Sequence, residues 1–190
     1  GIFFKDTGAG GYYTPAGESL RRAFLKSPLP FTRITSGFSA SRYHPVLKEW
    51  RAHRGIDYGA PTGTPVRAVS DATVKFVGKQ RGYGNLVILE HVKPYSTAYG
   101  HLSRFGTGLR KGGRVAQGQV IGYVGMTGLA SGPHLHYEFR VKDVQQNPLA
   151  MKLPSAYPLD NRSKASFLAE TQPLMQRLNL VRGHKLTALD

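Results

Sequence analysis

The stretch from Ser131 to Arg140, Ser-Gly-Pro-His-Leu-His-Tyr-Glu-Phe-Arg, constrains the fold of this chain more than any other. A Gly-Pro turn signal precedes an alternation of polar and apolar residues, which is typical of a β-strand with one face in a core. Such a strand places His134, His136 and Glu138 on its polar face. Two imidazoles on one side of a stiff strand indicate a metal or acid–base site. The alternative is a pair of histidines on a solvated face.

The composition is that of a soluble globular chain. Hydrophobic residues make up 40% of the 190 residues, and no apolar run approaches the ~18 residues that a membrane span needs. The chain starts at Gly1 without an initiator methionine or a signal-like run, so we expect a processed protein or a piece of a longer one. The absence of cysteine excludes cysteine nucleophiles, cysteine–zinc sites and disulfides.

The charge is strongly positive, with 26 Lys and Arg against 11 Asp and Glu, a net charge of +15. Such an excess favours polyanionic surroundings, which include nucleic acid, an anionic membrane surface and an acidic cell-wall polymer. The basic residues are scattered, and no nucleic-acid-binding motif stands out. We therefore expect no nucleic-acid partner; a basic nucleic-acid binder is the alternative.

The middle of the chain, residues 31–150, has the texture of an antiparallel β domain. Short runs rich in Val, Ile, Tyr and Thr alternate with Gly and Pro, and their close spacing favours hairpins over crossover helices. The predicted strands are Pro65–Ala68, Ala72–Gly78, Asn85–His91, Ser96–His101, Val120–Val124 and His134–Val141. The fold class is therefore mainly β.

Short helices are predicted on both sides of this domain. Residues 1–30 form an N-terminal extension with a helix over Ser19–Lys26. Residues 151–190 form an extended linker and a helix over Ser163–Leu180, interrupted at Pro173. The second helix either packs on the domain or binds a partner.

A second group of polar residues can complete a site with the His-x-His strand. His53 and Asp57 stand four apart in a Pro- and Gly-rich context that argues against a helix, and in an extended segment both point the same way. With one histidine of the strand they supply three ligands, the number found in catalytic zinc sites. His101 and the remaining histidine, either His134 or His136, suit the roles of proton acceptor and oxyanion stabiliser.

These residues resemble the LytM/lysostaphin-type zinc endopeptidases, which cut peptide crosslinks of bacterial peptidoglycan. The motifs that carry the resemblance across residues 31–148 are Ser36-Gly37-Phe38, Arg42-Tyr43-His44-Pro45, His53-x-x-x-Asp57, Gly63-Thr64-Pro65-Val66, Gly82-Tyr83-Gly84-Asn85, Gly125-Met126-Thr127-Gly128 and Gly132-Pro133-His134-Leu135-His136. The flanks resemble MepM-like murein endopeptidases of Gram-negative bacteria.

The resemblance implies a role for each of the polar residues. His53, Asp57 and His136 would bind one Zn²⁺ per chain, and His101 and His134 would be the catalytic pair. The strand geometry alone leaves open which histidine of the strand is the ligand.

The resemblance also implies a function. The partners would be peptidoglycan stem peptides, and the bond cut would join D-Ala to meso-diaminopimelate, with pentaglycine as the alternative within the family. A non-catalytic wall-binding protein or activator of other wall hydrolases is the alternative function. The location would be the cell envelope, in the periplasm of a Gram-negative bacterium, with membrane or wall association through segments outside this chain. Further domains of a longer parent chain could inhibit the site.

Three further residues are candidates for supporting roles. Asn85 and Tyr99 are predicted to contact substrate; the alternatives are a turn or strand-edge amide and aromatic packing, respectively. Glu138 either orients an imidazole or is a solvated or ion-paired strand residue.

Overall fold

A computed structural model describes most of the chain. The described residues are 2–5, 11–20, 23–31, 33–44, 48–151 and 159–183. The chain divides into two compact units, one formed by Phe24–Leu153 and the other by Gly1–Ala23 together with Pro154–Asp190. Each unit is described by itself.

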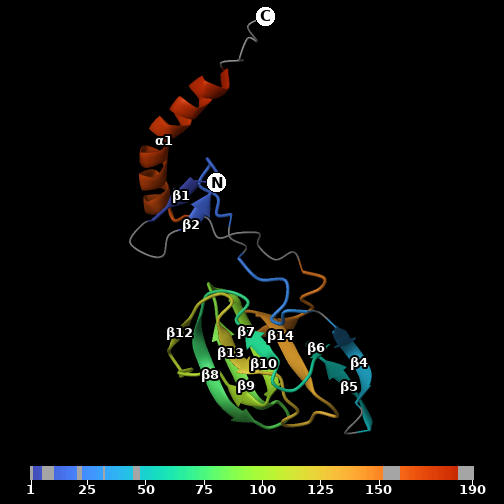
Figure 1. Ribbon diagram of the computed structural model, residues 1–190. Helices are drawn as coiled ribbons and strands as arrows, with labels where there is room; N and C mark the ends of the chain where they lie inside the picture. The colour runs from blue at the N-terminus through green and yellow to red at the C-terminus, as the bar shows by residue number, and fades with distance from the viewer. Residues whose placement is uncertain are drawn as a thin grey trace, which may run out of the picture. The chain divides into compact units, whose positions relative to one another are not determined.

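The unit Phe24–Leu153 is built from antiparallel strands (Figure 1). Its strands are β3 (Ile34–Ser36), β4 (Ser39–His44), β5 (Glu49–His53), β6 (Ile56–Gly59), β7 (Pro65–Arg67), β8 (Ala72–Gln80), β9 (Gly84–Glu90), β10 (Tyr95–Leu102), β11 (Arg104–Phe105), β12 (Arg114–Val115), β13 (Val120–Tyr123), β14 (His134–Val141) and β15 (Val144–Gln146). The largest sheet has the order β12-β8-β9-β10-β14-β6-β3, with β15 paired to β14. β11, β13 and β7 form a second sheet, and β4 and β5 form a hairpin.

This architecture confirms the predicted antiparallel β class. The six predicted strands match β7, β8, β9, β10, β13 and β14 to within two residues at each end. The remaining strands of this unit were not predicted, because they are short and several carry polar residues on both faces.

The His-x-His strand is a central strand of the large sheet. β14 lies between β10 and β6, and its apolar residues Leu135, Tyr137 and Phe139 are buried as the alternation predicts. His136 and Glu138 on the other face are also buried, at 8% and 1% exposure. The polar face of the strand is therefore enclosed by protein, and the alternative of a solvated face is wrong for these two side chains.

The N-terminal helix predicted over Ser19–Lys26 is wrong, since none of its described residues is helical. The Leu20 amide donates to the Tyr12 carbonyl, and the Leu25 amide donates to the Val69 carbonyl at 2.7 Å. Backbone donors that a helix would use internally are instead satisfied by carbonyls of other segments, so tertiary contacts override the local helix propensity.

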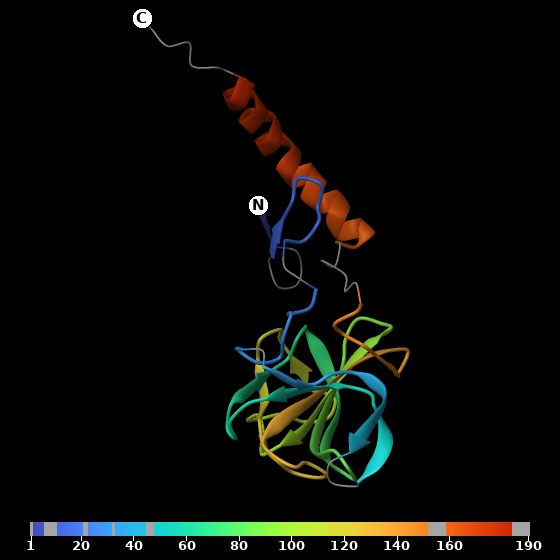
Figure 2. The ribbon, with the colours of Figure 1, turned by 90° about the vertical axis from the view of Figure 1, so that its right-hand side faces the viewer.

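The other unit combines a short hairpin with the C-terminal helix. Strands β1 (Ile2–Phe4) and β2 (Gly11–Tyr13) pair antiparallel, and α1 covers Asn161–Gly183. Figures 1 and 2 both show the blue hairpin beside the red helix. Phe167 is fully buried, with its ring centroid 5.3 Å from that of Phe4 and 5.7 Å from that of Tyr13. These rings form the core of this unit.

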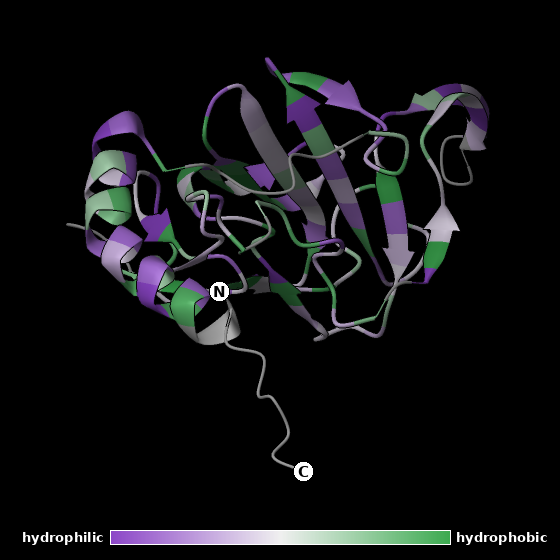
Figure 3. Cartoon of the chain, turned by 90° about the horizontal axis from the view of Figure 1, so that it is seen from above, coloured by the Kyte–Doolittle hydropathy of each residue, from purple (hydrophilic) through white to green (hydrophobic). Residues whose placement is uncertain are grey.

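The helix α1 runs through Pro173 without the predicted interruption. A proline inside a helix removes one N–H donor, and the hydrogen bonds on either side hold the helix together. Past Phe167 the apolar residues are exposed, Leu174 at 53% and Leu178 at 49%. Figure 3 shows hydrophilic and hydrophobic residues following one another along it. Within the described residues, no helix has the length and apolarity needed to cross a membrane.

Candidate metal centre

Strand pairing brings the predicted ligands together. β14 pairs with β6 so that His136 lies opposite Asp57, and His53 ends the β5 strand that leads into β6. The turn between them contains Gly55, where a Cβ atom would lie 2.6 Å from His136 Cε1 and 2.7 Å from the Tyr137 carbonyl oxygen. Only a glycine allows this close approach, so the turn can carry its two ligands against the histidine of β14.

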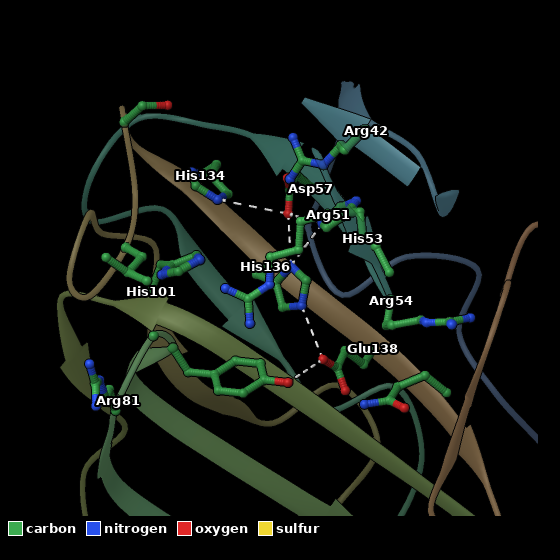
Figure 4. A pocket seen from close by; sticks show the side chains of 16 residues that line it. Arg42, Arg51, His53, Arg54, Asp57, Arg81, His101, His134, His136 and Glu138 are labelled. Atoms are coloured by element: carbon green, nitrogen blue, oxygen red, sulfur yellow. Dashed lines mark hydrogen bonds and ion pairs between the residues drawn. The ribbon is translucent and has the colours of Figure 1, made fainter. Parts of the chain in front are cut away.

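The three ligand side chains converge on one point (Figure 4). The His53 Nε2 atom lies 3.0 Å from Asp57 Oδ1 and 3.2 Å from His136 Nδ1. His136 Nδ1 lies 2.8 Å from the same carboxylate oxygen. All three residues are buried, and one ligand atom of each falls within 4.8 Å of the others.

Hydrogen bonds on the outer side of each imidazole decide which nitrogen faces the centre. His53 donates from Nδ1 to the Gly37 carbonyl at 2.7 Å, and His136 donates from Nε2 to Glu138 Oε1 at 3.2 Å. The inward nitrogens of the neutral rings therefore carry lone pairs. Two lone pairs and a carboxylate oxygen face each other, an arrangement that requires a positive charge between them.

The electrostatics of the centre agree with this requirement. Burial alone would raise the pKa of Asp57, but hydrogen bonds from His136 and His53 hold it well below its usual range. Burial would lower the pKa of His136, but hydrogen bonds to Asp57 and Glu138 raise it to about 9. Both shifts favour an ionised Asp57 beside a protonated His136, so the centre stabilises a positive charge next to this carboxylate.

The donor set fits zinc. Two ligands at 2.0–2.2 Å from a tetrahedral zinc ion lie about 3.3–3.6 Å apart. The three donor separations of 3.0, 3.2 and 2.8 Å are slightly shorter, so small side-chain movements would accommodate the ion. Two imidazoles and one carboxylate are also a ligand set that leaves a fourth position open in catalytic zinc sites.

Three residues that the sequence did not assign to the site hold Asp57 and Glu138 in place. Arg42 of β4 donates from NH2 to Asp57 Oδ2 at 3.1 Å. Tyr83 donates to Glu138 Oε1 at 2.6 Å. Arg140 holds the other oxygen of Glu138, at 2.6 Å from NH2 and 2.7 Å from Nε. The Glu138–Arg140 pair could have been predicted from the sequence, because two oppositely charged residues two positions apart in a strand lie on the same face.

Glu138 orients the imidazole of His136, one of the two alternatives expected from the sequence, and it also forms an ion pair with Arg140. Its carboxylate accepts from His136, Tyr83 and Arg140 while only 1% exposed. Burial would raise the pKa of Glu138, but the hydrogen bonds from His136 and Tyr83 lower it to about 2. The residue therefore stays ionised and fixes the ring of His136.

The two remaining histidines lie beside the ligands and face each other. The ring centroids of His101 and His134 are 4.6 Å apart, and His134 Nε2 lies 3.8 Å from Asp57 Oδ1. His101 donates from Nδ1 to the Thr127 carbonyl at 2.7 Å, and His134 donates from Nδ1 to the Gly132 carbonyl at 2.8 Å. In their neutral forms, both rings therefore keep the Nε2 lone pair free.

His101 has an unusual backbone conformation and a lowered pKa. Its φ of 59° lies in the left-handed region, which side chains other than glycine rarely adopt, and a β-bulge in β10 places it there. Burial lowers the pKa of His101 to about 4. At neutral pH it is an uncharged imidazole that can accept a proton.

The structure places neither predicted substrate residue in the pocket. Tyr99 is fully buried, and its hydroxyl lies 3.0 Å from Thr97 Oγ1, so the prediction of a substrate contact is wrong and the packing alternative holds. The Asn85 side-chain amide donates to the carbonyls of Leu102 and Ser103 at 2.9 and 3.2 Å. Asn85 instead anchors the end of the strand that carries His101, and it does not line the pocket.

A pocket of about 600 Å³ opens over the five polar residues. Figure 4 shows their side chains directed into it, with arginines around them. The charged and titratable residues that line it are His53, Asp57, His101, His134, His136, Glu138, Arg42, Arg51, Arg54 and Arg81. The pocket is large enough for a segment of peptide.

Comparison with known proteins identifies the class. Residues 51–148 match Peptidase family M23, and the chain belongs to this family of zinc metallopeptidases. The resemblance to LytM-type enzymes seen in the sequence is thereby confirmed.

Particular relatives are named wall enzymes. The chain is 43% identical over 173 residues to peptidoglycan DD-endopeptidase ShyC of Vibrio cholerae, which covers 91% of the chain and 40% of that protein. It is 45% identical over 164 residues to the DD-carboxypeptidase/endopeptidase Mpg of Neisseria meningitidis, covering 86% of the chain and 37% of that protein. A crystal structure of a zinc-containing peptidase from Vibrio cholerae matches with a TM-score of 0.64 and 35% identity, covering 76% of the chain and 47% of the other. The chain thus spans about 40% of the length of these curated relatives.

Proposed function

We propose that this chain is a zinc-dependent endopeptidase that hydrolyses peptide crosslinks of bacterial peptidoglycan. The observation that carries the proposal is the convergence of His53 Nε2, Asp57 Oδ1 and His136 Nδ1 within 3.2 Å of one another at the floor of a pocket. The names of the relatives ShyC and Mpg support peptidoglycan as the substrate. The peptidase domain covers residues 31–150.

In this proposal His53, Asp57 and His136 hold one zinc ion. When bound, zinc supplies Lewis acidity, which polarises a carbonyl and makes water a better nucleophile near neutral pH. The buried carboxylate of Asp57 contributes negative charge to the ligand set, and its pairing with Arg42 limits that contribution.

The chain's own residues then move the protons. His101, uncharged because burial lowers its pKa to about 4, accepts a proton at Nε2 from the attacking water. His134, whose ring faces that of His101 at a centroid distance of 4.6 Å, stabilises the oxyanion that develops on the scissile carbonyl. The hydrogen bonds from Nδ1 to backbone carbonyls keep both Nε2 atoms directed into the pocket.

The bond that we propose is cut joins D-Ala to meso-diaminopimelate. Both curated relatives carry a DD-specific activity in their names, which favours this bond over pentaglycine. The site of action would be the cell envelope, in the periplasm. Further domains of a longer parent protein could regulate access to the pocket.

The test is digestion of purified crosslinked muropeptides, with the products identified by mass spectrometry. The expected result is loss of dimers and appearance of monomers ending in D-Ala, abolished by a zinc chelator and restored by added zinc. The alternative is a wall-binding or activator protein of the same fold. Intact dimers after incubation with fully zinc-loaded protein would favour that alternative.

A further inference from the structure

The rim of the pocket carries an excess of positive charge. Arg42, Arg51, Arg54 and Arg81 all line the pocket, and Arg42 is engaged by Asp57. In the part of the chain that the structure describes, the other three form no ion pair, and their side chains are exposed. The guanidinium of Arg54 lies over Phe38, 5.9 Å from its ring centroid.

The carboxylates of the pocket cannot neutralise this charge. Asp57 faces Arg42 and the two ligand histidines, and Glu138 is held by Arg140 at 2.6 Å. A metal ion adds further positive charge at the floor. The rim is therefore a concave surface with a focused positive potential, which attracts anionic groups.

Strand pairing in the β4–β5 hairpin places two of the pocket arginines opposite each other. Arg42 and Arg51 are cross-strand partners, so their side chains share one face of the hairpin. Like charges in this position destabilise a hairpin unless an anion lies between or beside them. Asp57 supplies that anion for Arg42, and among the described residues Arg51 has no ion-pair partner.

The exposed arginines approach the histidines from more than one side. Arg51 and Arg54 belong to the β5–β6 segment, whereas Arg81 belongs to the turn between β8 and β9. Figure 4 shows Arg54 and Arg81 on different sides of His136. A peptide bond placed at the histidines would have these guanidinium groups around its flanking atoms.

We propose that the positive rim formed by Arg51, Arg54 and Arg81 attracts a free carboxylate on the carbon atom that bears the scissile amide nitrogen, and that one of these guanidinium groups binds it. This proposal rests on the peptidase function proposed above. In a D-Ala–meso-diaminopimelate crosslink, that carbon carries such a carboxylate. The carboxylate carbon is two covalent bonds from the scissile nitrogen and so enters the same pocket. Guanidinium groups bind carboxylates through paired, charge-assisted hydrogen bonds.

This recognition would decide which crosslinks are cut. A terminal D-Ala–D-Ala bond also carries a carboxylate next to its scissile nitrogen, so the same arginines would accept it. A pentaglycine bridge carries none at this position. The arginine rim therefore selects D,D-bonds with a neighbouring carboxylate over neutral bridges.

The experiment compares two muropeptide dimers that differ only at this carboxylate, one free and one converted to the primary amide. Zinc-loaded wild-type protein is expected to cleave the free form with a kcat/KM roughly 10- to 100-fold higher, the range for a lost charge-assisted hydrogen bond. In the triple variant Arg51→Gln, Arg54→Gln and Arg81→Gln, this ratio should fall toward one, because the kcat/KM for the free dimer falls more than that for the amidated dimer.

A matched control removes three positive charges outside the pocket. Arg110→Gln, Lys111→Gln and Arg114→Gln change exposed side chains that do not line the pocket, and the wild-type ratio should persist. Equal kcat/KM values for the two dimers in wild-type protein would overturn the carboxylate proposal and leave the peptidase function intact. An equal loss on both dimers in the pocket variant would overturn it as well.

Binding measured without turnover separates this proposal from the peptidase function. Isothermal titration calorimetry of each dimer against the zinc-loaded protein measures this affinity. If wild-type protein cleaves neither dimer but binds the free form at least about 10-fold more tightly, and the pocket variant loses that preference, the arginine proposal stands and the peptidase function fails. Equal affinity for both dimers would overturn the arginine proposal.

Discussion

The guanidinium of Arg42 lies 3.1 Å from the Oδ2 atom of Asp57 and thereby determines which oxygen of that carboxylate faces the ligand histidines. Oδ1 is left to approach His136 at 2.8 Å and His53 at 3.0 Å. Arg42 is brought to this place by the β4–β5 hairpin, which the sequence did not predict. The hairpin therefore orients the carboxylate as well as supplying His53.

Arg42→Gln is expected to weaken zinc binding by about 10- to 100-fold, the usual cost of losing a hydrogen-bond partner of a metal ligand. The reason is that the Asp57 carboxylate becomes free to rotate and loses its charge partner. Competition with a chromophoric chelator measures the affinity. Arg114→Gln, an exposed arginine outside the pocket, is the control. Unchanged zinc affinity in Arg42→Gln would remove the orienting role.

Glu138 is the second orienting group, and its replacement should cost both stability and metal affinity. Glu138→Ala leaves Arg140, whose side chain is 14% exposed, without its partner. Breaking a buried ion pair in this way destabilises by about 3–5 kcal/mol. Urea unfolding of the zinc-free protein measures this loss, with Glu90→Ala at an exposed position as the control.

The conservative variant Glu138→Gln separates the two effects. It keeps an acceptor for the His136 N–H, so zinc affinity should fall less than in Glu138→Ala. If both variants bound zinc as tightly as the wild type, Glu138 would serve the fold alone.

The local pattern predicted the strand that carries the site but not the roles within it. Alternation places His134 and His136 on one face, and the structure confirms this strand residue for residue. The pairing that sets His136 opposite Asp57 joins residues 79 positions apart, and no local pattern encodes that distance. The assignment of His136 as the ligand came from family resemblance and stays a proposal.

Two wrong predictions share one physical origin. Tyr99 was predicted to contact substrate, but β10 is a central strand covered on both faces, and Tyr99 is fully buried. A helix was predicted over Ser19–Lys26, but the Leu25 amide donates to the distant Val69 carbonyl. Tertiary contacts overrode the local pattern in both cases.

The glycine between His53 and Asp57 gives a sharp test of how closely the turn packs. In Gly55→Ala the new Cβ would meet the His136 ring at 2.6 Å and the Tyr137 carbonyl oxygen at 2.7 Å. The ring must move, so we expect zinc affinity to fall at least about 10-fold and the fold to lose about 1–3 kcal/mol.

Gly37→Ala is the matched control for this change. No atom lies within 4 Å of a Cβ at that position, and its carbonyl still accepts from His53. Zinc affinity and urea midpoint should stay near wild type there. Wild-type zinc affinity in Gly55→Ala would show that the ring does not need this position.

A buried histidine away from the pocket predicts how stability depends on pH. His91 donates from Nδ1 to the Asp71 carbonyl at 3.0 Å, and its Nε2 lies 2.8 Å from Thr97 Oγ1. Burial lowers the pKa of His91 below 6.5. The unfolded chain then binds more protons than the folded one below that pH, so stability should fall as the pH drops from 6.5 toward the folded pKa.

Urea unfolding of zinc-free protein from pH 8 to pH 5 measures this effect. His91→Gln removes the titrating group, and the fall in its free energy of unfolding over this range should be smaller than in the wild type. Parallel pH curves for the two proteins would show that His91 does not contribute.

The two histidines of β14, equal in the sequence, should differ when each is removed. His136 shares its Nδ1 with the ligand cluster at 2.8 and 3.2 Å, so His136→Ala should lose bound zinc and activity together. His134 lies 3.8 Å from Asp57 Oδ1 and faces His101, so His134→Ala should keep its zinc. Its turnover of crosslinked muropeptides should fall about 10²- to 10³-fold, the range for loss of a group that stabilises the oxyanion.

Elemental analysis of the purified variants, together with product formation from muropeptide dimers, distinguishes the two roles. The reason for the split is the outer hydrogen bond on each ring, which runs from Nε2 to Glu138 in His136 and from Nδ1 to the Gly132 carbonyl in His134. Each ring therefore presents a different nitrogen to the pocket. A His134→Ala protein that cleaves dimers at the wild-type rate, or a His136→Ala protein with a full complement of zinc, would reverse or cancel this division of labour.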